Sequence, residues 1–218
     1  MKILIACEIS GRVRDAFIKE GHNAFSCDIQ HNSHPKHITG NVLDIINDNW
    51  DLMVAHPPCT YLSWAGAGAL TFNRMQRQEE AIEFFKKLYF APIFHICIEN
   101  PLGYMNKYFM RESQIIHPYY FGDPQIKRTC LWLKNLPLLV PTNRLKKPAP
   151  VGYYKNGPKK GRSYNWADAQ GGRNRAEIRS ITFTGIANAM AKQWSIVNEM
   201  KFHNPITGSL ITGNYANV

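Results

Sequence analysis

Short apolar runs alternate with amphipathic segments along most of the chain. Continuous apolar runs bounded by turn residues predict buried strands, and they occupy residues 2–7, 23–27, 51–56, 93–98 and 128–133. Apolar residues spaced three or four apart predict helices, at residues 12–20, 74–90 and 181–200. Residues 29–40 are polar and loop-like, and residues 42–46 fit a short strand or a turn. The alternation of strand and helix predicts an α/β fold built on a doubly wound sheet.

Four of the apolar runs end at a polar or reactive group. The groups are the turn from Cys7 to Gly11, then Asp28, Cys59 and Glu99. In a parallel sheet the carboxyl ends of the strands lie along one edge, where α/β proteins bind their ligands. We therefore expect a thiol, two acids and a glycine turn to share one cleft. Taken alone, the turn is equally well an ordinary strand-to-helix connection, and Asp28 a helix cap or a solvated acid.

Cys59 is the most informative of these groups. It follows Pro57 and Pro58, which can continue neither a strand ladder nor a helix. The thiol is therefore held on a stiff, extended loop at a strand end. A lone cysteine is more often a small buried hydrophobe, but this context favours a nucleophile.

Glu99 follows the apolar run Ile96-Cys97-Ile98. A thiolate adds to an electron-poor ring more easily when a carboxyl group shares a proton with a ring nitrogen. Such an acid must be at least partly protonated near neutral pH, which requires a desolvated site. The alternative is a buried acid paired with an arginine.

The charge of the chain indicates a polyanionic partner. The net charge is +10 and the isoelectric point about 9.4. Residues 142–179 hold ten basic and two acidic residues, with four aromatic residues between them. This mixture fits a nucleic-acid surface, where basic groups meet phosphates and rings stack on bases, better than a merely solvated face. The expected contacts are Lys127, Lys146, Lys147, Lys159, Lys160, Arg162, Arg173 and Arg175.

Five cysteines without a Cys-x-x-Cys pair fit a reduced, cytoplasmic protein better than a disulfide framework. The apolar run at the N-terminus is too short for a signal peptide, and no stretch approaches the roughly 18 apolar residues of a membrane span. His31, His34 and His37 lie in a polar stretch without nearby cysteines or clustered acids. We expect a solvated loop there and no metal site.

In this order, the motifs resemble those of the cytosine carbon-5 DNA methyltransferase family. Ile9-Ser10-Gly11 resembles the first motif, which holds S-adenosylmethionine, and Asp28 falls where the family keeps the acid that binds ribose. Gly40-Asn41-Val42 resembles the Gly-Asp-Ile turn beside the adenine, with Asn41 in place of the acid and Asp44 as its substitute. Ile186-Ala187-Asn188-Ala189-Met190 resembles the last motif, where a helix closes over the cofactor.

In the family, the remaining motifs act on the target base. Pro57-Pro58-Cys59 matches the nucleophile motif, and Glu99-Asn100-Pro101 resembles Glu-Asn-Val, whose acid contacts the ring. Residues 121–128 resemble Gly-x-Pro-Gln-x-Arg-x-Arg. Five residues depart from the family pattern. Thr60 replaces the usual glutamine after the nucleophile, and Val13 and Arg14 replace glycines of the first motif. Lys127 and Thr129 stand where the Gly-x-Pro-Gln-x-Arg-x-Arg motif has arginines.

The resemblance implies a Rossmann-like S-adenosylmethionine-dependent methyltransferase sheet with a short basic recognition insert. The catalytic core would comprise residues 1–136 and 179–200, the target-recognition segment 137–178, and a loosely ordered tail 201–218. The cofactor would be held by Ile9, Ser10, Gly11, Asp28, Ile29, Asn41, Asp44, Pro57 and Asn188. Small stand-alone proteins of this type are common in phages and prophages.

The expected reaction is methyl transfer to carbon 5 of cytosine in single- or double-stranded DNA. Cys59 would add to carbon 6, and Glu99 would stabilise the charge at ring nitrogen 3. Arg128 or Lys127 would orient the target or favour the thiolate. Three alternatives stay open: modification of RNA or free nucleotides, methylation of an exocyclic amino group, and DNA binding without catalysis. The shortness of the recognition segment makes a homodimer plausible.

Overall fold

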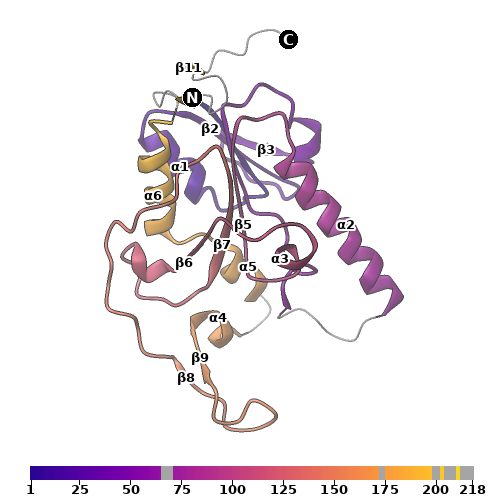
Figure 1. Ribbon diagram of the computed structural model, residues 1–218, viewed down its shortest axis with the longest axis vertical. Helices are drawn as coiled ribbons and strands as arrows, with labels where there is room; N and C mark the ends of the chain where they lie inside the picture. The colour runs from indigo at the N-terminus through magenta and orange to yellow at the C-terminus, as the bar shows by residue number, and fades with distance from the viewer. Residues whose placement is uncertain (65–70, 172–174, 198–201, 204–209, 212–218) are drawn as a thin grey trace.

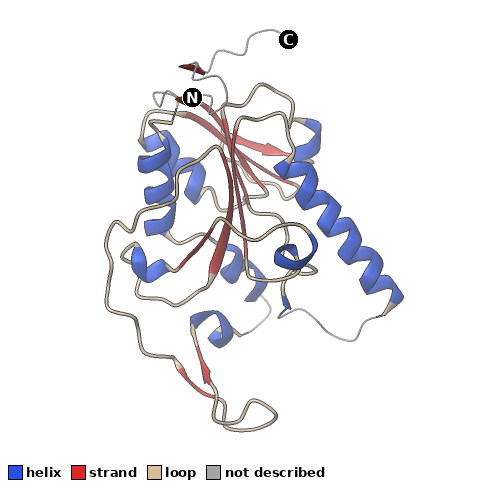
Figure 2. Cartoon of the chain, viewed as in Figure 1, coloured by secondary structure: helices blue, strands red, loops and turns tan. Residues whose placement is uncertain are grey.

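The computed structural model describes residues 1–64, 71–171, 175–197, 202–203 and 210–211. A seven-stranded sheet forms its centre, with helices on both faces (Figure 1, Figure 2). The strands are β1 (Lys2–Ala6), β2 (Asn23–Asp28), β3 (His37–Thr39), β4 (Leu52–Ala55), β5 (His95–Asn100), β6 (Gln114–Ile116) and β7 (Thr129–Lys134). Their order across the sheet is β3-β2-β1-β4-β5-β7-β6.

All strand pairings from β3 to β5 are parallel, whereas β7 runs antiparallel to both of its neighbours. This order, with a single reversed strand next to one edge, is typical of the Rossmann-like fold of S-adenosylmethionine-dependent methyltransferases. The predicted fold class is therefore confirmed. The carboxyl ends of β1, β2, β4 and β5 lie along one edge, as the sequence predicted.

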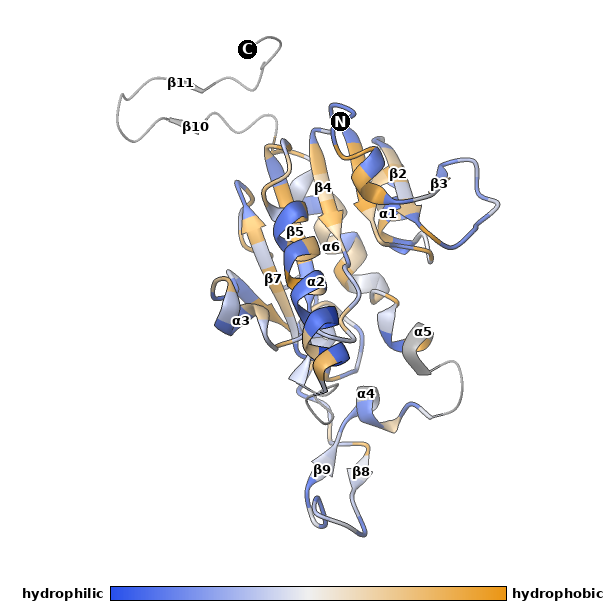
Figure 3. Ribbon diagram, turned by 90° about the vertical axis from the view of Figure 1, so that its right-hand side faces the viewer, coloured by the Kyte–Doolittle hydropathy of each residue, from blue (hydrophilic) through white to orange (hydrophobic). Residues whose placement is uncertain are grey.

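Helices cover the two faces of the sheet and enclose two cores. Helices α1 (Arg12–Lys19) and α6 (Thr184–Trp194) pack on one face, where Phe17, Met190 and Trp194 are fully buried. Helix α2 (Phe72–Tyr89) covers the other face with Phe85 and Leu88. Every residue of β4 and β5 is buried between these layers, which explains their continuous apolar runs. Figure 3 shows the apolar strands enclosed by helices with polar outer faces.

The connections carry the remaining short elements. These are the 3-10 helices η1 (Val42–Asp44) and η3 (Pro118–Tyr120), the helices α3 (Met105–Tyr108), α4 (Trp166–Ala169) and α5 (Arg175–Ser180), and the antiparallel pairs β8 (Gly152–Tyr153) with β9 (Ser163–Tyr164) and β10 (Phe202–His203) with β11 (Leu210–Ile211). Among the described residues, no helix combines the length and hydrophobicity that a membrane crossing would need.

Within the seven-stranded sheet, the sequence missed two strands and the extent of a third. Residues 29–40 were expected to be a loop but contain β3, and β6 was not predicted at all. Both are three residues long and lie at the edges of the sheet, so neither has a continuous buried run. Strand β5 continues through Glu99 and Asn100, because their backbone pairs with Leu131 and Cys130 of β7. The last helix begins at Thr184 and ends at Trp194, within the predicted range 181–200.

Residues 140–171, called the basic arm below, extend away from the sheet and carry the β8–β9 hairpin (Figure 1, Figure 3). Few of their described side chains are shielded from solvent, and beyond Val140 none is fully buried. Leu139, just before the arm, is buried in the core, and the Trp194 indole donates to the Pro137 carbonyl oxygen at 3.1 Å. The Val140 amide and carbonyl group also form hydrogen bonds with the Gln193 side chain, each at 2.8 Å, so contact with α6 continues to residue 140. The proposed tail lies largely outside the described residues.

Candidate active site

The parallel register of β4 and β5 builds the centre of the site. Ala55 lies opposite Ile98, so that His56 follows β4 at the level of Glu99. The Nδ1 atom of His56 is 3.1 Å from Oε2 of Glu99, and the two side chains are 8% and 11% exposed. The sequence motifs predicted a role for Glu99 but none for His56, although the histidine stands directly before the Pro-Pro pair.

The loop that carries Cys59 is clamped from the β5 side. Asn100 Nδ2 donates to the Pro57 carbonyl oxygen at 2.8 Å. The amide of Tyr104 donates to the Leu62 carbonyl oxygen at 2.8 Å. A Cβ atom at Gly103 would lie only 2.0 Å from that same oxygen, so glycine is required for this close approach. The expected stiffness of the Cys59 loop thus has a second source besides the prolines.

Cys59 is solvent exposed, and three charged residues act electrostatically on its thiol. Partial desolvation raises the pKa of the Cys59 thiol, and the negative charge of Glu99 raises it further. Lys127 and Arg179 oppose this and lower the pKa, because cations favour the thiolate. Lys127 Nζ also donates to the Arg179 carbonyl oxygen at 2.9 Å, which anchors the ammonium group. We call His56, Cys59, Glu99 and Lys127 the strand-end cluster.

Glu99 has a different charge state from the one expected. Burial alone would raise its pKa, but the Lys127 ammonium and the hydrogen bond to His56 outweigh burial, so that the pKa of Glu99 lies below its usual value. This direction is opposite to the one that a partly protonated acid would need. The physical reason is the two partners, which come from β4 and from the segment before β7.

Lys127 and Arg128 have distinct surroundings. Arg128 is exposed, and its charge acts on His117 and Cys130. The charge of Lys127 acts on Cys59 and Glu99. Lys127 therefore belongs to the strand-end cluster, whereas the sequence motif suggested Arg128 first for this role. Neighbouring residues of an extended chain point in opposite directions, so a match uncertain by one residue changes the assignment.

A cavity of about 340 Å³ lies beside the cluster, at the ends of β1 and β2. Its volume is in the range of small-molecule sites, roughly 300–1,000 Å³. It is lined by Asp28, Ile29, Asn41 and Pro58 together with Cys7 and Gly40. Three of the expected cofactor residues thus share one cavity, and Pro58 connects it to Cys59.

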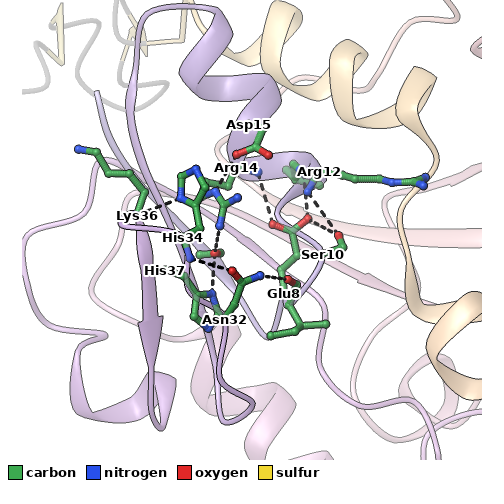
Figure 4. A network of polar contacts seen from close by, with 12 residues as sticks. Glu8, Ser10, Arg12, Arg14, Asp15, Asn32, His34, Lys36 and His37 are labelled. Carbon is green, nitrogen blue, oxygen red and sulfur yellow. Dashed lines mark hydrogen bonds and ion pairs between the residues drawn. The ribbon is translucent and has the colours of Figure 1, made fainter.

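The first turn is closed by an internal carboxylate. Glu8 is buried, and its side chain accepts hydrogen bonds from the amides of Val13 at 2.9 Å and Arg14 at 3.4 Å and from the Ser10 hydroxyl at 3.1 Å. It therefore caps α1, as an acid at a helix N-terminus can. Figure 4 shows Glu8 within this polar network. The signal in the sequence was an acid just ahead of the helix.

The side chain of Arg14 fills the space beside Gly11. Its Nη1 donates to Ser26 Oγ at 2.9 Å, and its Nε pairs with Asp15 at 2.8 Å (Figure 4). Gly11 has φ +73, and a Cβ atom there would lie 2.2 Å from Arg14 Nη2. Ser10 and Gly11 therefore belong to the turn itself and do not line the cavity.

The other expected cofactor residues lie around the cavity without lining it. The Ile9 carbonyl accepts from Asn32, Asp44 belongs to η1 and its charge acts on Cys27, and Pro57 is held by Asn100. Asn188 is exposed on α6. Asn41, which does line the cavity, caps η1 by accepting from the Leu43 amide at 3.1 Å.

The expected nucleic-acid residues of the basic arm are exposed. They are Lys146, Lys147, Lys159, Lys160 and Arg162. Aromatic rings accompany the cations: Lys159 Nζ lies 5.5 Å from the ring centre of Tyr154. Arg173 and the side chain of Arg175 lie outside the described residues. Among the described residues, no group of three histidine, cysteine or acidic side chains could hold a metal ion.

No protein-family model matches the chain, and no curated protein sequence matches it either. A solved structure with a similar fold is that of a Spodoptera frugiperda DNMT2 E260A/E261A/K263A mutant, at 19% sequence identity and a TM-score of 0.36. The match covers 70% of this chain and 57% of that chain. The assignment of a methyltransferase fold rests on the strand order and the reversed strand.

Proposed function

We propose that this protein transfers a methyl group from S-adenosylmethionine to carbon 5 of cytosine in DNA. The observation that carries the proposal is the strand-end cluster. An exposed thiol on a clamped Pro-Pro loop lies within electrostatic reach of a buried carboxylate and a lysine, beside a cavity of small-molecule size. These are the groups that addition to a pyrimidine ring requires.

The cavity fits the nucleoside part of the cofactor. The Asp28 carboxylate would accept hydrogen bonds from the ribose hydroxyls. At Gly40 nothing lies within 4 Å of the place of a Cβ atom, so a flat base can approach the backbone beside Asn41. The cofactor would supply an electrophilic methyl group. Because Glu8 already satisfies the amides of Val13 and Arg14, other groups must hold the methionine end.

The residues of the cluster have separate tasks. Cys59, as thiolate, forms a bond to carbon 6 of the ring. Lys127 favours the thiolate and so offsets part of the effect of Glu99 on it. Glu99 stabilises the charge that develops at ring nitrogen 3. Loss of the proton from carbon 5 then restores the ring double bond and expels the thiolate.

The basic arm would hold the nucleic acid. Its cations are exposed, next to tyrosine rings, which suits phosphate contacts and base stacking. In duplex DNA the target base must first leave the stack, at a cost of a few kcal/mol. The phosphate contacts would offset this cost.

The test is covalent trapping. The protein is incubated with labelled S-adenosylmethionine and DNA that contains 5-fluorocytosine, since fluorine cannot leave as a proton does. We expect a stable adduct at Cys59 that is absent from Cys59→Ser. Methylation of ordinary DNA that survives Cys59→Ser, without any adduct, would instead indicate amino-group chemistry. An adduct on RNA but not on DNA would reassign the substrate.

A further inference from the structure

His56 has a feature that the reaction of Cys59 and Glu99 leaves unexplained. Its ring is buried at the end of β4 and bonded through Nδ1 to Glu99. Its second nitrogen, Nε2, is buried and has no hydrogen-bond partner among the described residues. Buried polar atoms are nearly always paired, because an unpaired one loses its hydrogen bonds to water without replacement. A histidine held at this cost calls for a functional explanation.

The surroundings of Glu99 show that the proposed reaction needs a source for the proton of ring nitrogen 3. His56 approaches it from β4 and Lys127 from the segment before β7, while its charge acts on the thiols of Cys59, Cys97 and Cys130. The Lys127 charge and the hydrogen bond to His56 keep the pKa of Glu99 below its usual value. A carboxylate has no proton to give, yet ring nitrogen 3 needs one when carbon 6 is attacked. The proton must therefore reach Glu99 from a neighbour.

We propose that His56 is the proton partner of Glu99, and that the two side chains together deliver one proton to ring nitrogen 3. The inference rests on the proposed function and deepens it. In the proposed reaction His56 acts through Glu99, to which it is hydrogen bonded, so it is a positioning residue. Of the two partners near Glu99, Lys127 already donates to the Arg179 carbonyl, whereas His56 is hydrogen bonded to Glu99 itself.

The protons and electrons balance over the cycle. The Cys59 sulfur forms a bond to carbon 6, and the displaced electron pair spreads to nitrogen 3. Nitrogen 3 takes a proton from Glu99, which is replaced from Nδ1 of the His56 imidazolium. After methyl transfer, carbon 5 loses its proton to solvent, the carbon 5–carbon 6 double bond reforms and the sulfur–carbon bond breaks. The proton on nitrogen 3 then returns to the Glu99–His56 pair.

The proton has a direct path between the two side chains, because Nδ1 of His56 lies 3.1 Å from Oε2 of Glu99. The parallel register of β4 and β5 fixes the distance over which it moves.

Two variants separate proton delivery from simple support. His56→Asn keeps an N–H donor toward Glu99 but cannot give up a proton, whereas His56→Ala removes both functions. Methyl transfer to unmethylated DNA is measured from mildly acid to mildly alkaline pH. We expect His56→Asn to lower kcat by about 10²-fold, no better than His56→Ala, with unchanged KM for DNA and cofactor. We also expect the pH profile of kcat to differ from that of the wild type, because His56→Asn removes a side chain that can take up and release a proton. Wild-type kcat and pH profile in His56→Asn would overturn the proposal.

A measurement on the unmodified protein covers the case in which the variants fold poorly. Nitrogen-15 NMR of labelled histidine reports the protonation of His56 in the free protein and in the trapped 5-fluorocytosine adduct at one pH. We expect the ring to lose a proton when the adduct forms. An unchanged ring in the adduct overturns the role of His56 alone. Failure of the wild type to form any adduct overturns the proposed function and this role with it.

Discussion

The strand-end cluster and the basic arm differ in how their side chains are held. In the cluster, every residue of β4 and β5 is buried, and the loops that follow are tied together by hydrogen bonds. In the arm, the described side chains beyond Val140 are exposed or only partly buried, and each strand of the hairpin is two residues long. Chemistry at the cluster depends on fixed geometry, whereas attraction between cations and phosphates acts over several ångströms and tolerates variation.

This difference predicts two kinds of response to substitution. A change in the cluster should alter the rate steeply and leave affinity for DNA nearly constant. A change in the arm should alter affinity and its dependence on salt, in small and additive steps, and leave the rate at saturating DNA constant.

Glu99→Gln is the sharpest test of the cluster, because two quantities should move in opposite directions. Methyl transfer should fall by about 10²- to 10⁴-fold, since the side chain no longer shares a proton with the ring. The Cys59 thiol should become more acidic, because the charge of Glu99 raises its pKa. Alkylation by iodoacetamide as a function of pH measures the second effect, with Cys59→Ser as the control. A parallel loss of transfer and of thiol reactivity would mean that Glu99 mainly supports the fold.

Gly103→Ala and Gly171→Ala compare the two regions with one matched change. A Cβ atom at Gly103 would lie 2.0 Å from the Leu62 carbonyl oxygen, whereas at Gly171 nothing lies within 4 Å. We expect Gly103→Ala to lower the free energy of unfolding by about 1–3 kcal/mol. It should also lower kcat by as much as about 10²-fold, by displacing the Cys59 loop. Gly171→Ala should change the free energy of unfolding by less than about 0.5 kcal/mol. Equal effects of the two variants, in urea titrations and in rate, would contradict the comparison.

The two regions also differ in how far the sequence predicted them. Continuous apolar runs located β1, β2, β4, β5 and β7, and the rule that parallel strands share an edge located Cys59 beside Glu99. Binary patterns report burial, so the buried part of the molecule was accessible to them. In the arm, composition predicted the charge but not the β8–β9 hairpin, because its two-residue strands leave no periodic pattern.

Within the cluster, the sequence failed where residues from separate elements meet. The charge state of Glu99 depends on His56 and Lys127, which approach from different segments. The local apolar run could indicate burial of Glu99 but not these partners. In the same way, Glu8 caps the N-terminus of α1 only because the turn between them folds back, and the sequence did not predict the shape of that turn.

Removal of three cations from the arm tests the second region. Lys159, Lys160 and Arg162 are exposed around the hairpin loop. In the variant with all three replaced by glutamine, the slope of log affinity against log salt should become shallower. The expected change is about 0.9 for each duplex phosphate that the arm no longer neutralises. The rate at saturating DNA should stay the same. Fluorescence anisotropy with labelled DNA over a salt series measures the slope.

The control replaces exposed lysines on the helices of the core. Lys19, Lys87 and Lys192 lie on α1, α2 and α6. Their replacement by glutamine changes the net charge by the same amount, three positive charges, but should leave the salt dependence nearly unchanged. An identical change of slope in both variants would show that DNA responds to the net charge of the protein and not to the arm.

Lys127→Gln and Arg128→Gln give the smallest expected effects and decide which cation belongs to the cluster. Loss of the Lys127 charge should raise the pKa of Cys59, since that charge lowers it, and shift thiol alkylation to higher pH. It should also raise the pKa of Glu99 toward its usual value.

Because the pKa of Glu99 is depressed in the folded protein, it contributes stability above its unfolded pKa, and this is lost as pH falls through the folded value. The stability contributed by Glu99 should therefore be smaller in Lys127→Gln. In urea titrations over a pH series, the free energy of unfolding of this variant should fall less steeply at acid pH. Arg128 is exposed and lies one residue away. Arg128→Gln should therefore leave the pH dependence of Cys59 alkylation unchanged. A shift with Arg128→Gln and none with Lys127→Gln would return the role to the arginine that the sequence motif first suggested.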